Sequence, residues 1–579
     1  MLSLLRQVSK ESPVSLLTRL RPPSPADTPA TDADKAPRTW RLVLGRIVTV
    51  LAAVLIFAAL LLPNQPFSIT PTAFLRVPVE ALVAVALLLV LPGRARSIVA
   101  LTLGALLGLL TLIKALDLGF WSFLNRQFDL VADWGLLDDG LGVLEDSIGK
   151  GGARAVAALV LVLAVAVVSL LALATLRLSR VIVRHRRVST RAGIAVTAAW
   201  VVCATLGAQV VPGLPVASRS EAEFVRDRAL LVRQGVENQR AFERAVEVDS
   251  FAKTPANQLL TGLAGKDVVV SFIESYGRSA IEDPALSAYV NPVLDEGTKQ
   301  LTAAGFTTRS AWLTSPTYGG YSWLAHSTFQ SGLSIDNQMR YLSLVSSDRF
   351  TLTGAFKRAG WDTVGIEPDN TYAWPEGDFY GYRRIWDARN LGYQGPHFSW
   401  SRMPDQYTLA AFQRNEYGRK GRGPMLAEVT LTSSHTPWAP IPQMIDWDAV
   451  GNGSVYTAQA AAGKSPDQVW KDPAQVRTEY AKSVAYSVSA LTSWAQKYGD
   501  DNLVLVFLGD HQAAPIVSGE HASHDVPITI VAKDPKVLDR ISGWGWQDGL
   551  KPGPQAPVWP MDAFRDRFLT TFGPQGESH

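Results

Sequence analysis

The chain has 579 residues, more than one compact domain usually holds, and 18% of them are charged, below the roughly 25% of an ordinary soluble protein. Its single cysteine, Cys203, lies inside an apolar run, which excludes an internal disulfide framework and a cysteine-based zinc site. The formal net charge of +3 is small, so its distribution says more than its value. Long apolar runs fill the first two hundred positions, and the rest has the pattern of a globular protein.

Residues 1–40 are predicted to form a disordered cytoplasmic tail, in which prolines gather at 22–37. Five later stretches have roughly the 20 mostly apolar residues of a membrane-crossing helix. They are residues 42–62, 73–91, 98–118, 155–176 and 192–211. The second is the weakest, because two charged residues and a proline lie near its start. We therefore expect a five-helix transmembrane domain over residues 41–212.

Lysine and arginine in the connecting segments predict the orientation of these helices. The N-terminal segment and the connections after the second and fourth spans are basic, whereas residues 63–72 are uncharged and residues 119–153 are rich in acids. The N-terminus is therefore expected inside the cell, and five crossings place everything after residue 212 outside. The first apolar run starts too late and is too long for a cleavable signal peptide.

Two opposite charges, Lys114 and Asp117, lie near the end of the third predicted span. Such side chains usually reach the membrane interface, and the alternative is a polar pair inside the bundle. The next segment, residues 213–265, is expected to be a linker. Its residues 220–250 are charged with helical apolar spacing, which indicates a connecting helix near the membrane surface.

From about Lys266 the pattern changes to short apolar runs that alternate with longer amphipathic ones. This pattern indicates an α/β domain, residues 266–579, with helices on both faces of a sheet. The clear strands lie at 268–273, 363–366, 425–431, 503–508 and 526–531. Because ligands of open α/β sheets bind at the carboxyl ends of strands, the residues beside these strands are the first candidates for a site.

Acids and imidazoles lie close beside four of these strands: Glu274, His435, Asp510, His511, His521 and His524. A parallel sheet would gather most of them at one edge. Glutamate, aspartate and histidine together suit Mn²⁺, Zn²⁺ or Mg²⁺. A single strand-end Asp could instead cap the next helix, and a single His could be an ordinary packed group, so the prediction of a metal site rests on their coincidence.

A further candidate lies in TYGGYSWLAHSTFQSGL, residues 317–333, where a Gly-Gly turn precedes Ser322 and a helical apolar pattern. Helix N-termini bind anions through free backbone N–H groups and the helix dipole. A hydroxyl at that position, beside a divalent cation, would have a lowered pKa and could attack a phosphate. The alternative is that Ser322 only caps the helix.

Together these motifs resemble the alkaline phosphatase superfamily, and within it the membrane-anchored, sulfatase-like branch. The sequence is most similar to lipoteichoic acid synthases and more distantly to lipid A phosphoethanolamine transferases. The order of motifs carries the resemblance: a strand ending in Glu-Ser, a Gly-rich turn with a hydroxyl at a helix start, SSHTPW, and Gly-Asp-His. It covers the five-span plan and residues of about 266–535. It implies an extracytoplasmic sulfatase/alkaline-phosphatase-like α/β domain on the plasma membrane of a bacterium.

By position, the resemblance implies that Glu274, Ser322, Asp510 and His511 hold one divalent ion, with Mn²⁺ expected first and Zn²⁺ or Mg²⁺ as alternatives. Ser322 stands where the family usually has threonine, and the resemblance makes it the nucleophile. His435, in SSHTPW, matches the family's substrate-contacting histidine.

The resemblance also implies a substrate-binding segment at the aromatic-rich residues 367–387. Trp374 is the best candidate there, and Arg383 would contact phosphate unless it is simply a solvated surface group. A further family histidine near the metal is matched by His521 or His524, and the sequence does not decide between them.

The activity implied by the resemblance is transfer of a phosphoryl headgroup of the phosphoglycerol type. The donor would be a membrane phospholipid and the acceptor an envelope glycolipid or polymer, with a phosphoserine between them and no nucleic acid as partner. The C/S-x-P-x-R motif of true sulfatases is absent after Ser322, which disfavours sulfate-ester hydrolysis. Two alternatives stay open: a membrane-tethered phosphodiesterase or phosphatase that uses water, and a non-catalytic envelope scaffold or sensor.

Overall fold

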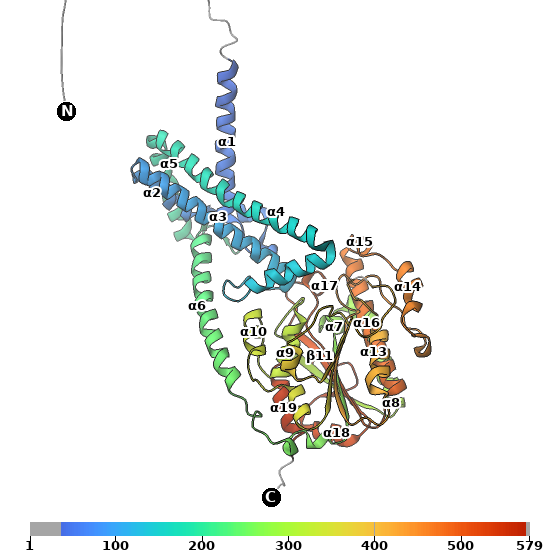
Figure 1. The fold of residues 1–579 in the computed structure, drawn as a ribbon. Helices are drawn as coiled ribbons and strands as arrows, with labels where there is room; N and C mark the ends of the chain where they lie inside the picture. Colours follow the sequence, from blue (N-terminus) through green and yellow to red (C-terminus); the bar gives the residue numbers. More distant parts are fainter. Residues whose placement is uncertain (1–35, 399, 575–579) are drawn as a thin grey trace, which may run out of the picture.

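The computed structural model of the chain describes residues 36–398 and 400–574. The predicted tail therefore lies almost wholly outside the described residues. A group of long apolar helices comes first, and an α/β domain follows from β5 onward. The two are connected by α6 (Ser220–Glu247), which runs from the helices along the side of the α/β domain (Figure 1).

The first part consists of α1 (Ala36–Leu61), α2 (Val79–Val90), α3 (Gly93–Leu124), α4 (Trp134–Arg184) and α5 (Arg186–Leu206). Within the described residues, four segments are long and apolar enough to cross a membrane: Trp40–Leu61, Gly93–Leu124, Ile148–Arg184 and Arg186–Leu206. The third begins at the kink in α4, where Gly149 leaves helical geometry, and the fourth follows the turn at His185. Four of the five predicted spans thus have a matching helix.

The second predicted span, residues 73–91, differs from the expectation. Its first part forms a 3₁₀ turn at Pro71–Leu75 and the short strand β1 (Val77–Pro78), which leaves 12 residues for α2. At 1.5 Å per residue α2 is about 18 Å long, well short of the roughly 30 Å of a bilayer core. Proline cannot donate a backbone N–H inside a helix, so Pro78 disfavours extension of α2 toward its N-terminus. The count of five full spans is therefore not confirmed.

The helices nevertheless reverse direction one after another. Arg177 of α4 donates to the carbonyl of Gly45 in α1, so the basic end of α4 lies beside the start of α1. Gly104 of α3 packs against the backbone of α4 at Leu171 and Gly108 packs against it at Val168, so these two helices are antiparallel as well. Trp200 near the end of α5 donates to the Val77 carbonyl just before α2. The short α2 therefore runs in the direction predicted for a second pass.

Lys114 and Asp117 are buried rather than placed at an interface. Lys114 pairs with Glu221, and Asp117 pairs with Arg228, so both partners come from α6. Asn64 also donates to Asp117 at 3.0 Å. The prediction of interfacial anchoring is wrong, because the partners that hold these charges lie more than one hundred residues away in the sequence. Two buried ion pairs fix α6 to α3.

The helix α6 contacts both parts of the protein, and its predicted position near the membrane surface stays a prediction. Its first half carries the two ion pairs to α3, and its last turns reach the α/β domain. There Phe242 and Val246 pack with Leu324, Ile335 and Tyr341. The apolar residues of α6 therefore pack against protein toward its two ends, whereas Val225 and Leu230 between them are exposed.

The α/β domain is built on a nine-stranded sheet with the order β12-β6-β11-β10-β5-β9-β7-β8, and β13 pairs with β6. The strands are β5 (Asp267–Ile273), β6 (Thr307–Thr314), β7 (Asp362–Glu367), β8 (Arg384–Asp387), β9 (Met425–Leu431), β10 (Leu503–Gly509), β11 (Asp525–Ala532), β12 (Gln547–Asp548) and β13 (Val558–Pro560). All five predicted strands are present. The central strands β10, β5, β9, β7 and β8 are parallel, whereas β11 is antiparallel to β10.

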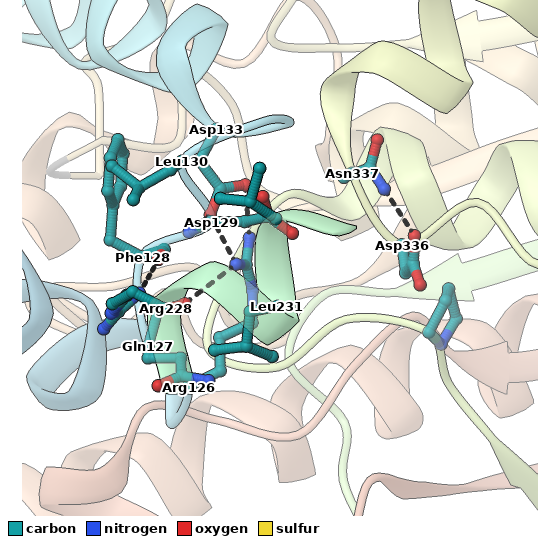
Figure 2. A pocket seen from close by; sticks show the side chains of 12 residues that line it. Arg126, Gln127, Phe128, Asp129, Leu130, Asp133, Arg228, Leu231, Asp336 and Asn337 are labelled. Carbon is teal, nitrogen blue, oxygen red and sulfur yellow. Dashed lines mark hydrogen bonds and ion pairs between the residues drawn. The ribbon is translucent and has the colours of Figure 1, made fainter. Parts of the chain in front are cut away.

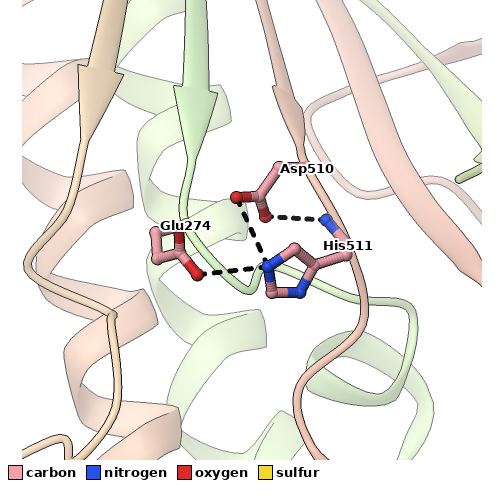
Figure 3. A group of neighbouring side chains, drawn as sticks. All are labelled: Glu274, Asp510 and His511. Carbon is pink, nitrogen blue, oxygen red and sulfur yellow. Dashed lines mark hydrogen bonds and ion pairs between the residues drawn. The ribbon is translucent and has the colours of Figure 1, made fainter. Parts of the chain in front are cut away.

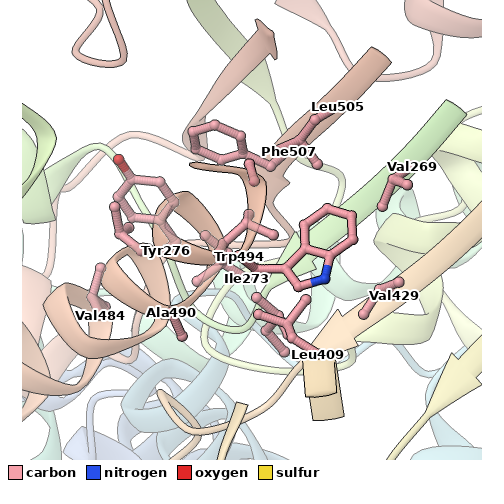
Figure 4. Close-up of a cluster of buried hydrophobic side chains, with 14 of the residues drawn as sticks. Val269, Ile273, Tyr276, Leu409, Val429, Val484, Ala490, Trp494, Leu505 and Phe507 are labelled. Atoms are coloured by element: carbon pink, nitrogen blue, oxygen red, sulfur yellow. The ribbon is translucent and has the colours of Figure 1, made fainter. Parts of the chain in front are cut away.

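Helices cover both faces of this sheet. One face packs against α8 (Pro284–Ala303), α13 (Asp405–Phe412) and α16 (Pro473–Tyr498), and the other against α9 (Ser322–Ser331), α11 (Leu352–Arg358), α18 (Pro535–Arg540) and α19 (Ala563–Thr571). Figure 4 shows Trp494 of α16, which is fully buried among side chains of the parallel strands such as Val269 and Val429. This core holds the strand ends in place.

Shorter elements lie in the connections. They are β2 (Gln209–Val211), β3 (Leu214–Pro215), β4 (Ala217–Ser218), α7 (Ser279–Glu282), α10 (Gln338–Val345), α12 (Gly377–Tyr380), α14 (Thr457–Ala462), α15 (Pro466–Val469) and α17 (Pro515–Ser518).

The carboxyl edge of the parallel strands lies toward the apolar helices. Gly319, in the loop that follows β6, packs against the end of α3 so closely that a Cβ there would lie 1.9 Å from the carbonyl oxygen of Phe123. Gly319 also has a φ of 72°, which only glycine adopts without strain. The ring of Phe67 lies 5.9 Å from that of His521 in the loop before β11. The two parts of the protein therefore meet beside the edge where a ligand would bind.

Candidate active site

Glu274 and Asp510 directly follow the neighbouring parallel strands β5 and β10. These strands pair in register, with Gly509 opposite Ile273, so the next residue of each lies at the same level. Gly509 allows this approach, because a Cβ there would lie 1.9 Å from the carbonyl oxygen of Tyr276. The loop after β5 therefore folds back over the end of β10 and brings the two carboxylates together.

Figure 3 shows how Glu274, Asp510 and His511 face one another. His511 Nε2 lies 3.3 Å from Glu274 Oε1 and 3.7 Å from Asp510 Oδ2. One oxygen or nitrogen from each of the three can be chosen so that all lie within 4.8 Å of one another. All three side chains are buried. We call them the Glu274 cluster.

The donors of the Glu274 cluster are oriented as those of a metal site are. His511 Nδ1 lies 2.9 Å from the carbonyl of Gln512, a hydrogen bond that leaves Nε2 as the ligand atom. Asp510 Oδ1 accepts from the backbone N–H groups of Ser275 and His511, at 2.7 Å each. Asp510 Oδ2 is buried and has no hydrogen-bond partner in the described residues. A bound cation would supply the missing partner, so these residues fit a divalent metal ion.

The charges of the cluster lead to the same conclusion. Burial, together with the Glu274 carboxylate, raises the pKa of Asp510 to about 7. Burial disfavours a charged imidazole, but Asp510 and Glu274 outweigh it and raise the pKa of His511 to about 9. Two carboxylates and an imidazole thus share one buried space. A divalent cation between them would keep both carboxylates ionised and the imidazole neutral.

Ser322 is the first residue of α9, and its hydroxyl reaches the Glu274 cluster. The Oγ atom lies 2.8 Å from Glu274 Oε2 and 3.2 Å from His511 Nε2. The N-cap residue of α9 is Tyr321, not Ser322. The alternative in which Ser322 only caps its helix is therefore wrong. A hydroxyl, two carboxylates and an imidazole meet at the N-terminus of a helix.

Left-handed backbone surrounds this meeting point. The described residues include five non-glycine residues with positive φ, and three of them, Ser275, Tyr321 and Trp438, border the site. Ser275 follows Glu274, Tyr321 precedes Ser322, and Trp438 lies three residues after His435. Such a conformation costs of order 1–3 kcal/mol for a non-glycine residue and persists where the surroundings hold it, often at functional sites.

Residues 266–527 match the family model for sulfatases. This segment of the chain is a sulfatase-family domain. The match runs from just before β5 into β11, so it includes every residue of the Glu274 cluster as well as Ser322. The family resemblance predicted from the order of the motifs is confirmed.

Among solved structures, the chain is similar to the lipoteichoic acid synthase LtaP from Listeria monocytogenes, with 15% identity, 59% of this chain and 78% of that chain covered, and a TM-score of 0.38. It is also similar to the phosphoglycerol transferase GacH from Streptococcus pyogenes, with 12% identity, 58% and 91% covered, and a TM-score of 0.35. A third similar structure is the soluble domain of lipooligosaccharide phosphoethanolamine transferase A from Neisseria meningitidis. It has 13% identity, with 55% of this chain and 93% of that chain covered, and a TM-score of 0.36. No curated protein matches the chain.

His435 of the sulfatase-family domain lies beside the Glu274 cluster but outside it. Ser434 donates to the Glu274 carbonyl at 2.6 Å, which ties the SSHTPW turn to the end of β5. The His435 ring stacks on Trp400, with ring centroids 3.6 Å apart, and its Nδ1 lies 2.6 Å from the Thr436 carbonyl. These contacts hold the ring in one orientation, and Nε2 is the nitrogen that Thr436 does not engage.

The aromatic-rich segment, residues 367–387, contains two predicted substrate-binding residues, Trp374 and Arg383. Trp374 packs on Tyr380 and Tyr382, with ring centroids 5.4 and 6.0 Å away. The structure does not bring Arg383 to the Glu274 cluster. Its backbone N–H donates to the carbonyl of Thr363, near the start of β7, so the exposed Arg383 lies toward the opposite edge of the sheet. The prediction failed because the chain returns to the amino edge before it enters β8.

His521 and His524 both lie at the carboxyl edge of the central strands, although they precede a strand. The reason is that β11 is antiparallel to β10 and begins near the end of β10. His521 is exposed and close to Phe67, whereas the ring of His524 lies 5.2 Å from that of Tyr318. Neither belongs to the Glu274 cluster.

A second set of potential ligands, His326, Glu367 and Glu428, was missed in the sequence. Their ligand atoms also lie within 4.8 Å of one another. Glu428 stands inside the apolar run MLAEVTL, which forms β9. A charged residue in the middle of a central strand is the signal that could have found this set. We call it the Glu428 cluster.

A cavity of about 300 Å³ lies where the sulfatase-family domain meets the apolar helices (Figure 2). The segment after α3, the middle of α6 and the loop residues Pro316 and Asp336 line it. The two arginines in its wall are already paired, Arg126 with Asp133 and Arg228 with Asp117. These ion pairs hold the wall together, so neither arginine is a free phosphate ligand.

Proposed function

We propose that this protein is a metal-dependent phosphotransferase. It would move a phosphoryl headgroup of the phosphoglycerol type from a membrane phospholipid to an envelope glycolipid or polymer, through a phosphoserine at Ser322. The observation that carries the proposal is the Ser322 hydroxyl, which lies 2.8 Å from Glu274 Oε2 and 3.2 Å from His511 Nε2 at the start of a helix.

In this proposal Glu274, Ser322, Asp510 and His511 hold one divalent ion. Carboxylate and hydroxyl oxygens with one imidazole nitrogen suit Mn²⁺, with Zn²⁺ and Mg²⁺ as alternatives. When bound, such an ion lowers the pKa of the hydroxyl and offsets charge on a phosphate oxygen. Glu274 Oε2 accepts the hydrogen bond of the Ser322 hydroxyl and so orients Oγ.

The reaction then follows from the placement of the side chains. Ser322 Oγ forms a bond to phosphorus while its proton leaves through Glu274 Oε2 to solvent, and the bond between phosphorus and the diacylglycerol oxygen breaks. The free N–H groups at the start of α9 point toward the phosphate oxygens. His435 Nε2 gives a proton to the departing oxygen and later takes one from the acceptor hydroxyl, which attacks the phosphoserine. The bond between phosphorus and Ser322 Oγ breaks, and Oγ regains a proton from solvent through Glu274 Oε2.

The same proposal places the protein in a bacterial plasma membrane, with the N-terminus in the cytoplasm and the sulfatase-family domain outside. The basic ends of α1 and α4 lie together, as the Arg177–Gly45 contact indicates. Clustered lysine and arginine favour the cytoplasmic side.

The proposal is tested with the full-length protein in detergent, incubated with phosphatidylglycerol and Mn²⁺. Intact mass is expected to reveal a phosphoglycerol adduct on Ser322 that depends on the metal, while diacylglycerol is released. Free glycerol phosphate in the presence of a glycolipid acceptor would identify a hydrolase instead. An adduct on another residue would refute the assignment of Ser322, and bound metal with neither adduct nor diacylglycerol would refute the donor.

Replacing His435 by alanine is expected to lower kcat for diacylglycerol release by about 10²-fold, because general acid–base assistance contributes typically about 10²–10⁴-fold. The metal content should not change, since His435 lies outside the Glu274 cluster. His185→Ala, at the exposed turn between α4 and α5, is the control and should keep full activity. A His435→Ala variant as active as wild type would exclude the proposed role.

A further inference from the structure

The Glu428 cluster lies on the sheet face that α9 covers. Register pairs Gly365 of β7 with Glu428 of β9, and side chains two residues apart on a strand share a face. Glu367, the last residue of β7, therefore points to the same side as Glu428. His326 comes down from α9 onto this face, four residues and about one turn after Ser322. Three distant segments thus bring an imidazole and two carboxylates together.

Neighbouring groups fix each member of the cluster. The His326 ring stacks on Phe272 with a centroid distance of 3.7 Å, and its Nδ1 lies 3.1 Å from Glu428 Oε1. Glu428 Oε2 accepts from Gln330, and Glu367 Oε2 accepts from Thr430 at 3.0 Å. The donors are therefore held in place before any ligand arrives.

These contacts leave two ligand atoms unused. His326 Nε2 and Glu367 Oε1 are both buried and have no hydrogen-bond partner in the described residues. Buried polar atoms are normally paired, and an unpaired one costs roughly 1–3 kcal/mol. A bound ion of suitable charge would give such atoms a partner.

The charge of the cluster is also unbalanced when both of its carboxylates are ionised. Glu428 is 2% exposed, and a second carboxylate lies within ligand distance of it. Burial raises the pKa of Glu367 to about 7, which the Glu428 carboxylate favours as well. The imidazole of His326 can offset at most one of the two negative charges. Buried charges in proteins are paired or bind metals.

We propose that His326, Glu367 and Glu428 form a second divalent-cation site, separate from the Glu274 cluster. One imidazole nitrogen and two carboxylate oxygens are donors suited to Zn²⁺ or Mn²⁺, with the remaining positions open to water. The ion would link α9, β7 and β9. Because it needs no substrate, this site does not depend on the proposed phosphotransferase function.

The experiment counts metal ions in the full-length protein in detergent. The protein is stripped with a chelator, reloaded with Zn²⁺ or Mn²⁺ and separated from free metal, and bound metal is measured by mass spectrometry. Wild type should hold about two ions per chain, whereas Glu367→Gln, His326→Ala and Asp510→Asn should each hold about one. Asp369→Asn, which removes a carboxylate two residues beyond Glu367, is the matched control and should hold about two.

A second measurement separates metal binding from a structural role of the same residues. Added metal is expected to raise the Tm of stripped Asp510→Asn protein, in which only the Glu428 cluster remains, and this rise should vanish in the Asp510→Asn/Glu367→Gln double variant. Glu367→Gln is nearly isosteric and removes a buried charge, so it should fold. The proposal is overturned if folded Glu367→Gln and His326→Ala hold as much metal as wild type. It is equally overturned if Asp510→Asn binds none.

Discussion

Ser322→Ala is expected to form no phosphoglycerol adduct and to lose at least about 10³-fold in kcat for diacylglycerol release. The alanine has no oxygen to bond to phosphorus, so the covalent step cannot occur. Glu274, Asp510 and His511 remain in place, because within the described residues the Ser322 side chain hydrogen-bonds only to Glu274 and His511. The variant should therefore still bind metal and keep its Tm. Intact mass and lipid analysis measure the two outcomes.

Ser322→Thr is the matched control for this prediction. Threonine keeps the hydroxyl at the same position, and it is the residue that the family resemblance implies for the nucleophile. We expect Ser322→Thr to form the adduct and to retain most of the activity. An adduct that persists in Ser322→Ala would move the nucleophile elsewhere. Loss of activity in both variants with metal still bound would indicate a positioning requirement at this helix start.

Gly509→Ala is expected to lower kcat by at least about 10²-fold, since displacement of a catalytic group by about 1 Å can cost that much. The added Cβ would lie 1.9 Å from the carbonyl oxygen of Tyr276, and backbone cannot move aside as a flexible side chain can. The loop after β5 must then shift away from β10, which separates Glu274 from Asp510. Metal content should fall as in Asp510→Asn, while overpacking costs about 1–3 kcal/mol of stability.

The control for Gly509→Ala is Gly543→Ala, where a Cβ would meet nothing within 4 Å. That variant should match wild type in activity, metal content and Tm. If Gly509→Ala remains folded and retains wild-type activity, the close approach of the two strand ends is not needed to assemble the site.

The central sheet could be predicted because its strands are mostly apolar runs. Residues 503–508 form β10 and residues 425–431 form β9 largely as expected. In contrast, β6 has the sequence TTRSAWLT, in which polar and apolar residues mix, and it was not predicted. Its place in the sheet depends on pairing with β11 and β13, which are far away in sequence. Local pattern cannot supply that information.

The candidate site likewise contains residues whose position could be predicted from sequence and residues whose position could not. Glu274 and Asp510 were predicted because they end recognisable strands, and a parallel sheet aligns such ends. Arg383 was misplaced because its position depends on the register between β7 and β8. Lys114 and Asp117 were misread because their partners lie on α6. A residue at the end of a recognisable strand can be placed from the sequence alone. A residue whose position depends on partners far away in the chain can be placed only from the three-dimensional structure.

The contact between Gly319 and the carbonyl of Phe123 limits where chemistry can take place. Gly319 lies three residues before Ser322, and Phe123 is in the last turn of α3, so the contact holds Ser322 near the end of that apolar helix. Under the proposed function, a donor lipid reaches Ser322 without leaving its leaflet, and the acceptor is the partner that must travel. Acceptor choice would then depend on how near a hydroxyl group can come to the membrane surface, in addition to its chemical identity.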